Sequence, residues 1–301
     1  MRKSKSVLDR PIIVFGTGRS GTTIISEALL RHELLAFPSN YDEWFPGRSN
    51  VAYFRRIFDN ARWRYEGKKK QINSTGFLNR IAFIPGESYS MWSFLCRGEV
   101  NFSRGFLLDD RLSGPTRSRA ITFFEEMVRK QRRSRLALKI TGPSRLGFLL
   151  DLFPNARFIR ITRDAVPTIS SWLKVDFWRS KGASRLWWQG AYSPEQVQWA
   201  DGHKGHPHML AAMQYAKLME VAQYEMESTN APVLEVPYEQ FITEPKYWMK
   251  KMLNFCELES SGWIDDYMDR NPLRANERPD VELFSDRELS EIRQMLNKKW
   301  K

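Results

Sequence analysis

The sequence contains few cysteines and no long apolar run. Its 301 residues include only two cysteines, Cys96 and Cys256, which are too few and too far apart for a disulfide framework or a paired-cysteine metal site. The apolar run nearest the N-terminus, at residues 11–15, is too short for a secretory signal core or a membrane span. We therefore expect a cytoplasmic protein with no transmembrane segment and with both thiols unpaired.

Acidic residues are also scarce relative to basic ones. The chain has 35 aspartates and glutamates against 47 lysines and arginines, which gives a net charge of +12 and a pI near 9.7. Such a charge favours an anionic partner, which could be nucleic acid, anionic lipid or a polyanionic small molecule. No nucleic-acid-binding module, internal repeat or low-complexity segment is visible. We therefore expect a small anionic ligand and no nucleic acid, and we leave peripheral membrane contact open.

Apolar residues make up 42% of the chain, enough for a core, and they alternate between strand-like and helix-like patterns. Strands are predicted at residues 11–15, 135–140, 156–162 and 232–236, and helices at about 22–31, 145–153, from Pro167 onward, 209–227, 244–258 and 286–300. This alternation predicts an α/β fold with a central parallel sheet and helices on both faces. We expect a single domain over residues 1–301, in which two irregular, aromatic-rich insertions, 41–134 and 176–206, cap the sheet and form an acceptor pocket.

A glycine-rich loop, "FGTGRSGTT" at residues 15–23, follows the first strand directly, where such a turn usually holds a phosphate. Its glycines match the dinucleotide pattern GxGxxG, but that pattern needs a strand ending in an acid about 20 residues later. Asp42 and Glu43 stand at about that distance but lie in a turn-like stretch. The loop also approximates the ATP-binding pattern GxxxxGK[ST], but Thr22 occupies the position of the lysine that would contact the β- and γ-phosphates.

A third interpretation fits this loop better. The loop resembles the 5′-phosphosulfate loop of sulfotransferases, which use 3′-phosphoadenosine 5′-phosphosulfate (PAPS) as donor. The resemblance implies that backbone amides and hydroxyls at the start of the following helix hold the 5′-phosphate. It also implies that Arg19 lies at the oxygen that bridges phosphorus and sulfur, where negative charge develops as the S–O bond breaks. The phosphate-binding residues that it implies are Ser20, Gly21, Thr22 and Thr23.

A second motif, "FIRITRDAVPTISSWL" at residues 158–173, supports the same family. An apolar strand ends in Arg163 and Asp164, and Ser171 follows inside the next helix. This order and spacing resemble the 3′-phosphate motif of sulfotransferases. The planar guanidinium of arginine suits a phosphate, and a hydroxyl from the helix completes the contact. The resemblance therefore implies that Arg163 and Ser171 bind the 3′-phosphate.

Two softer matches extend the resemblance from about Pro11 to Leu258. In "LALKITGPSRLGFLLDLFPNARFIRITRD", Lys139 falls on the lysine that the family places near the transferring sulfuryl group. In "VPYEQFITEPKYWMKKMLNFCEL", Tyr238 falls on a tyrosine near the nucleotide. The chain departs from the family at "ITGP", where Thr-Pro follows the lysine in other members, and at Ala165, where many carry proline. The implied fold is a P-loop-like three-layer domain.

The residue that would take the proton from the substrate hydroxyl is the least defined residue of the predicted site. Many members of the family carry a glutamate about twenty residues after the first loop, where it can take the proton of an incoming hydroxyl. The glutamate followed by aromatic residues in "EWF" favours Glu43, and Asp42 and Asn40 are alternative alignments.

Other kinds of site are less well supported. The stretch "HKGHPH" brings together His203, His206 and His208, a possible metal cluster, but no matching cysteine or acidic pattern accompanies it, so we expect no metal. A serine nucleophile would need a GxSxG elbow, and "GRSGT" is not one.

The sequence thus predicts a PAPS-dependent sulfotransferase that acts on a small-molecule or glycan hydroxyl, either a carbohydrate or another alcohol. Arg19, Lys139 and Glu43 are its predicted catalytic residues. Two alternatives remain: an atypical nucleotide kinase that uses the same loop, and a nucleotide-binding protein without catalysis. A kinase should need magnesium and bind ATP, whereas a sulfotransferase should do neither.

Overall fold

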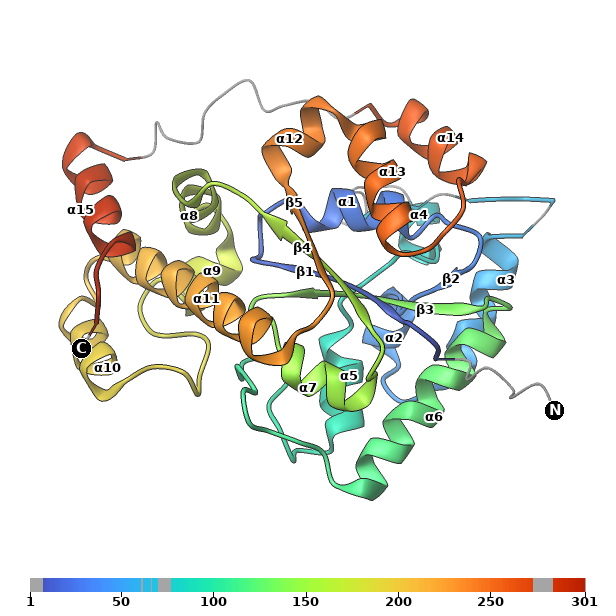
Figure 1. Ribbon diagram of the computed structural model, residues 1–301, viewed down its shortest axis with the longest axis horizontal. Helices are drawn as coiled ribbons and strands as arrows, with labels where there is room; N and C mark the ends of the chain where they lie inside the picture. The colour runs from blue at the N-terminus through green and yellow to red at the C-terminus, as the bar shows by residue number, and fades with distance from the viewer. Residues whose placement is uncertain (1–7, 61, 66, 70–76, 273–283, 301) are drawn as a thin grey trace.

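The computed structural model describes residues 8–60, 62–65, 67–69, 77–272 and 284–300. Five parallel strands form one sheet in the order β2-β3-β1-β4-β5 (Figure 1). Their bounds are β1 (Ile12–Gly16), β2 (Leu35–Ala36), β3 (Arg135–Thr141), β4 (Arg157–Thr162) and β5 (Val233–Pro237). The four predicted strands are confirmed. The fifth, β2, is two residues long and carries no pattern that would reveal it.

The central strand β1 explains why the sheet is covered on both sides. Ile13 and Phe15 point into the core on one face, whereas Ile12 and Val14 point into the core on the other. Successive side chains of a strand alternate between faces. A strand buried on both faces therefore reads as one continuous apolar run, as "IIVF" does.

One face of the sheet is covered by the helices in the upper part of Figure 1. Ile25 and Leu29 of the first helix pack there with Trp248 and Met252, which lie further along the chain. The helices on or near this face are α1 (Thr22–Leu29), α4 (Phe77–Ile81), α12 (Tyr238–Thr243), α13 (Pro245–Phe255) and α14 (Gly262–Arg270).

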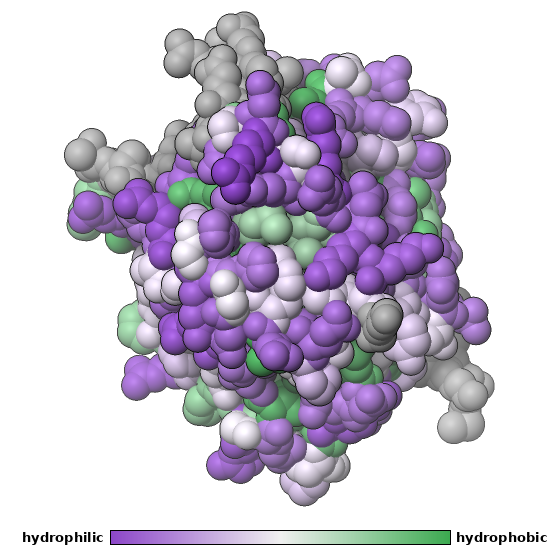
Figure 2. Space-filling model, turned by 90° about the vertical axis from the view of Figure 1, so that its left-hand side faces the viewer, coloured by the Kyte–Doolittle hydropathy of each residue, from purple (hydrophilic) through white to green (hydrophobic). Residues whose placement is uncertain are grey.

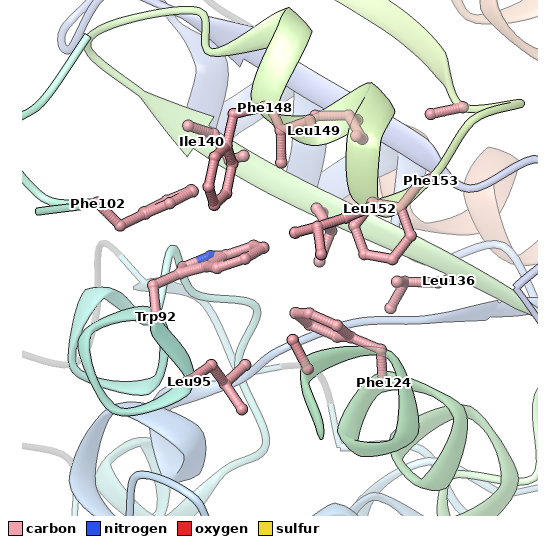
Figure 3. Close-up of a cluster of buried hydrophobic side chains, with 14 of the residues drawn as sticks. Trp92, Leu95, Phe102, Phe124, Leu136, Ile140, Phe148, Leu149, Leu152 and Phe153 are labelled. Carbon is pink, nitrogen blue, oxygen red and sulfur yellow. The ribbon is translucent and has the colours of Figure 1, made fainter. Parts of the chain in front are cut away.

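The opposite face is covered by α5 (Tyr89–Cys96), α6 (Gly114–Lys130) and α7 (Leu146–Leu152), in the lower part of Figure 1. Figure 3 shows the core beneath them, where the rings of Trp92 and Phe102 stack with centroids 4.0 Å apart. Several aromatic residues of segment 41–134 are therefore core residues rather than pocket residues.

Segment 41–134 is also more regular than the sequence predicted, since it contains the 17-residue helix α6. Its buried residues follow helical spacing: Ala120, Phe123, Phe124, Met127 and Val128. The same segment holds α2 (Asn40–Trp44), whose first residue precedes it, η1 (Ser49–Phe54) and α3 (Arg55–Phe58).

A third group of helices lies beside the sheet, at the left of Figure 1. It comprises α8 (Ala165–Leu173), α9 (Asp176–Lys181), α10 (Pro194–Gly202), α11 (Pro207–Thr229) and α15 (Asp286–Leu296). Three indoles form a tryptophan cluster in its interior, with centroids 4.6 Å apart for Trp172 and Trp178 and 5.5 Å apart for Trp172 and Trp188. Figure 2 shows the outer surface on this side, which is mostly hydrophilic. None of the helices in the described ranges is long and apolar enough to cross a membrane.

Candidate active site

The glycine-rich loop connects β1 to α1 at the carboxyl edge of the sheet. Gly21 has φ +85° and precedes the first turn of α1, and Arg19 also has a positive φ, +68°. Ser20 is buried, and its hydroxyl donates to the carbonyl oxygen of Thr17 at 2.7 Å. The Trp172 indole N–H donates to the carbonyl oxygen of Gly18 at 2.6 Å. The tryptophan cluster therefore fixes the loop from one side.

The start of α1 is open to an anion. No side chain caps its first turn, so the amides of that turn have neither an intrahelical acceptor nor a side-chain one. Thr22 is buried and Thr23 is half-buried. Amides directed along a helix axis, together with the positive end of the helix dipole, favour a phosphate or sulfate at this position.

Arg19, Arg163 and Ser171 meet beside this helix start. The Arg19 Nε donates to the Ser171 hydroxyl oxygen at 2.9 Å, and an Arg163 Nη donates to the carbonyl oxygen of Arg19 at 2.9 Å. The backbone of Arg163 is held in turn by the Tyr215 hydroxyl, which donates to its carbonyl oxygen at 2.7 Å. Arg163 follows β4 and Ser171 lies in α8, so the local strand–turn–helix unit brings both to the loop after β1.

Tyr238 closes the site from the next strand. It is the first residue of α12, directly after β5, and its ring covers Gly21 so closely that a Cβ on Gly21 would lie 2.1 Å from a ring carbon. The Arg163 guanidinium lies over the same ring, 5.0 Å from its centroid. Only glycine fits at position 21, because of both its φ and this contact.

Lys139 brings a second positive group to the loop from β3. It is 3% exposed, and its ammonium donates to the Thr23 hydroxyl oxygen at 2.7 Å. Its carboxylate partner is Glu87, with Nζ and Oε1 2.8 Å apart. Glu87 also pairs with Lys69 at 3.3 Å and accepts a hydrogen bond from the Thr141 hydroxyl at 3.1 Å.

The charges of Lys139, Glu87 and Lys69 shift one another's pKa values. Burial alone would raise the pKa of Glu87, but Lys139 and Lys69 outweigh it and lower that pKa to about 2. Burial lowers the pKa of Lys139, and Glu87 partly offsets this effect. Glu87 is therefore ionised throughout the physiological range, and its charge helps Lys139 to keep its proton.

The three residues considered as the base are engaged in local hydrogen bonds. Both carboxylate oxygens of Glu43 accept from Ser90, from its amide at 3.0 Å and its hydroxyl at 2.6 Å. Asp42 forms a capping box with Ser39 at the start of α2, and Asn40 bonds to the backbone of residues 82 and 84. Within the described residues, no hydrogen bond or ion pair joins Glu43 to Arg19, Thr23 or Lys139.

The histidine stretch forms ordinary hydrogen bonds. The His208 Nε2 lies 2.8 Å from a Glu291 carboxylate oxygen, and the His203 Nδ1 lies 2.7 Å from the carbonyl oxygen of Trp199. No group of three or more histidine, cysteine or acidic side chains that could hold a metal occurs in the described part of the chain. Cys96 and Cys256 are buried and unpaired.

The structure thus brings together nine of the ten predicted site residues at the ends of β1, β3, β4 and β5: Arg19, Ser20, Gly21, Thr22, Thr23, Lys139, Arg163, Ser171 and Tyr238. Glu43 instead accepts hydrogen bonds from Ser90 at the start of α5. Sequence reasoning missed Glu87, Lys69 and Trp172. The first two belong to segments without periodicity, and the third looks like an ordinary apolar residue of a helix.

Known proteins resemble this chain in family and in fold. The model of the sulfotransferase family matches residues 11–263. Sulfotransferase STF9 from Mycobacterium avium has a similar structure, with a TM-score of 0.58 at 17% identity over 95% of this chain and 75% of that one. Sulfotransferase STF1 from Mycobacterium tuberculosis H37Rv is 15% identical, with a TM-score of 0.46 over 96% of this chain and 77% of that one. No curated protein matches.

The structural likeness to STF9 concerns the fold, and the observed parallel sheet with helices on both faces is the predicted P-loop-like α/β architecture. The family match extends from the first strand to the start of α14 and includes every residue of the group at the sheet edge. On this match, the chain belongs to the sulfotransferase family.

Proposed function

We propose that the protein transfers a sulfuryl group from PAPS to a hydroxyl acceptor. The observation that carries the proposal is the convergence of an uncapped helix start, the Arg19–Ser171–Arg163 contacts and the buried Lys139 on one edge of the sheet. This arrangement offers separate positive regions for two phosphates and a sulfuryl group, as PAPS requires.

The donor would be held in two places. The amides of the first turn of α1, with the hydroxyls of Thr22 and Thr23, would bind the 5′-phosphate. Arg163 and Ser171 would bind the 3′-phosphate through a guanidinium and a hydroxyl. Tyr238, whose ring faces Gly21 and Arg163, would form one wall of the nucleotide site.

The reaction would be an in-line displacement at sulfur. The acceptor oxygen forms a bond to sulfur as the bond from sulfur to the bridging oxygen breaks, and the electron pair of that bond stays on the 5′-phosphate. Arg19 would stabilise the charge on this leaving oxygen, and Lys139 the charge on the sulfuryl oxygens. The acceptor's proton goes to a base, and the products are a sulfate ester and 3′-phosphoadenosine 5′-phosphate (PAP).

For that base we retain Glu43. Glu43 belongs to α2, and its carboxylate accepts from Ser90 on the first turn of α5, three positions beyond the loop residue Glu87 that contacts Lys139. Trp44 and Phe45, which follow it, are 48% and 43% exposed and could stack on a sugar ring or another apolar alcohol. We therefore propose a carbohydrate or other alcohol as acceptor. Glu43→Gln should abolish turnover with such an acceptor while leaving PAP binding unchanged.

The kinase alternative lacks the group that it needs most. Thr22 stands in the position of the phosphate-binding lysine, and Lys139 comes from a different strand. The non-catalytic alternative would leave the Lys139 ammonium beside the helix start without a function.

Calorimetric titration with PAP tests the proposal, with and without magnesium, beside ATP with magnesium. We expect magnesium-independent binding of PAP that Arg163→Ala weakens by roughly 100-fold, since it removes a charge-assisted contact. Arg179→Ala, which removes an exposed arginine paired with Asp176, is the matched control and should have no effect. A preference for ATP with magnesium would refute the proposal.

A further inference from the structure

Glu87 lies at a position where nothing in the sequence motifs requires an acid. It sits in the loop before α5, and two hydrogen bonds fix that loop on either side of it. The Gly86 amide donates to the carbonyl oxygen of Pro38 at 2.9 Å, and the Ser88 hydroxyl donates to that of Ser39 at 2.9 Å. The Glu87 carboxylate is thus directed at Lys139 by neighbours that belong to the start of α2.

Lys139 needs such a partner. A lysine buried to this degree loses its proton easily unless a carboxylate compensates for the missing water. Several charged or titratable groups surround the pair. Glu87 and Glu27 favour the ammonium form of Lys139, and Lys69 disfavours it; the Tyr89 phenol, which donates to the carbonyl oxygen of Thr141 at 2.5 Å, responds to the charge of Glu87.

The ammonium of Lys139 is held between two oxygens. On one side is the Thr23 hydroxyl in the first turn of α1, and on the other is Glu87. A donor phosphate at the helix start would therefore place its attached sulfuryl group within reach of this ammonium, whereas the nucleotide parts bound by Arg163 and Ser171 would not reach it.

We propose that Glu87 is a positioning residue that keeps Lys139 charged and fixed beside Thr23, so that the site distinguishes the sulfated donor from the desulfated nucleotide. The inference rests on the proposed function, because it assigns the sulfuryl group to Lys139. It predicts that Glu87 affects binding of PAPS more strongly than binding of PAP, because only PAPS carries the sulfuryl group.

The test is calorimetric titration of wild type and Glu87→Gln with PAP and with PAPS, without acceptor, at pH 6, 7.5 and 9. The glutamine keeps the shape of the side chain but removes the charge that raises the pKa of Lys139. That pKa should fall, so the ammonium is lost as the pH rises and regained as it falls. In the variant, PAPS binding should weaken by about tenfold at pH 9 and recover towards pH 6.

Four further variants make the result specific. Glu225→Gln removes another buried carboxylate, which accepts from the Gly147 amide at 3.0 Å and from Ser144, and should change neither affinity. Lys139→Met should reduce PAPS affinity at every pH, and adding Glu87→Gln to it should have no further effect. Glu87→Asp keeps the negative charge but moves it further from Lys139, because the side chain is shorter. It should change the pH dependence of PAPS binding less than glutamine does.

The outcomes separate the two proposals. If wild type binds neither nucleotide, the proposed function fails. If wild type binds both but the ratio of PAPS to PAP affinity in Glu87→Gln equals that of wild type at each pH, the role of Glu87 is wrong. Should glutamine prevent folding, detected as lost PAP binding, the aspartate variant decides: an unchanged ratio would again overturn the proposal.

Discussion

Two groups of cations reach the same edge of the sheet but are held in different ways. Arg19 and Arg163 hydrogen-bond to a hydroxyl and to a backbone carbonyl of the loop, near solvent. Lys139 is buried and depends on a carboxylate supplied by a distant loop. The first group is fixed by the backbone of strand ends, whereas the second is fixed by the balance of charges. The two should respond differently to mutation and to pH.

The largest effect on the site around Arg19 and Arg163 is expected from adding a single carbon at Gly21, in the same loop as Arg19. In Gly21→Ala the Cβ would lie 2.1 Å from the Tyr238 ring, at φ +85°. We expect a loss of roughly 2–5 kcal/mol in the free energy of unfolding, from backbone strain and overpacking together, and no measurable PAP binding. Urea unfolding and calorimetry would measure the two effects.

Gly98→Ala is the matched control for this prediction. Gly98 has a similar φ of +77°, but a Cβ there would meet nothing within 4 Å. It should cost only about 1 kcal/mol, the backbone part alone, and leave PAP binding intact. Equal effects of the two substitutions would show that the contact with Tyr238 does not matter.

The surroundings of the second group can be examined through pH, because Asp42 accepts from Ser39, whose carbonyl oxygen accepts from Ser88 beside Glu87. Asp42 is 1% exposed, and burial raises its pKa to about 6 despite two hydrogen bonds from Ser39. The folded protein thus keeps this proton to a higher pH than the unfolded chain does. Raising the pH from 4 to 6 should therefore lower the free energy of unfolding, by at most about 3 kcal/mol from this group.

Asp42→Asn should remove this contribution to the pH dependence of the free energy of unfolding. The amide oxygen of the asparagine can still accept from Ser39. Urea unfolding of wild type and variant between pH 4 and 7 measures the difference. Glu87, whose pKa is lowered, acts in the opposite sense: its stabilisation is present above its ordinary pKa and is lost only as the pH falls towards 2. If the free energy of unfolding of Asp42→Asn changes with pH as steeply as that of wild type between pH 4 and 7, the assignment to Asp42 is wrong.

The smallest expected effect concerns the support of the loop by the tryptophan cluster. Trp172→Phe removes the N–H that donates to the carbonyl oxygen of Gly18 and should weaken PAP binding about threefold to tenfold. Trp178→Phe is the control, since the Trp178 indole N–H has no hydrogen-bond partner among the described residues. If both variants bind PAP equally well, the indole contact does not position the loop.

The difference between the two groups also explains which parts of the molecule could be predicted. Ser171 and Arg163 belong to one strand–turn–helix unit, and Tyr238 follows β5 directly, so their spacing along the chain fixes their place in space. The four longer strands are predictable for a different local reason, because a buried strand leaves an apolar run in the sequence.

Glu87 could not be predicted in this way. It follows a Pro-Gly turn in a segment without periodicity, and its partners Lys69 and Lys139 come from other parts of the chain. Buried charges of this kind are recognised only when the fold brings them together. The helix α6, by contrast, had a helical pattern of apolar residues that the many charged residues around it concealed.

The contact between Tyr238 and Gly21 has a consequence for how the protein is made. β5 is an edge strand that pairs only with β4 in the described sheet, and the nucleotide wall begins at the residue that follows it. During synthesis, the loop after β1 emerges first but cannot be completed until the chain beyond residue 238 has been made and has added to the sheet. Nucleotide binding is therefore coupled to the docking of this last strand, and the bound nucleotide should slow hydrogen exchange of the β5 amides.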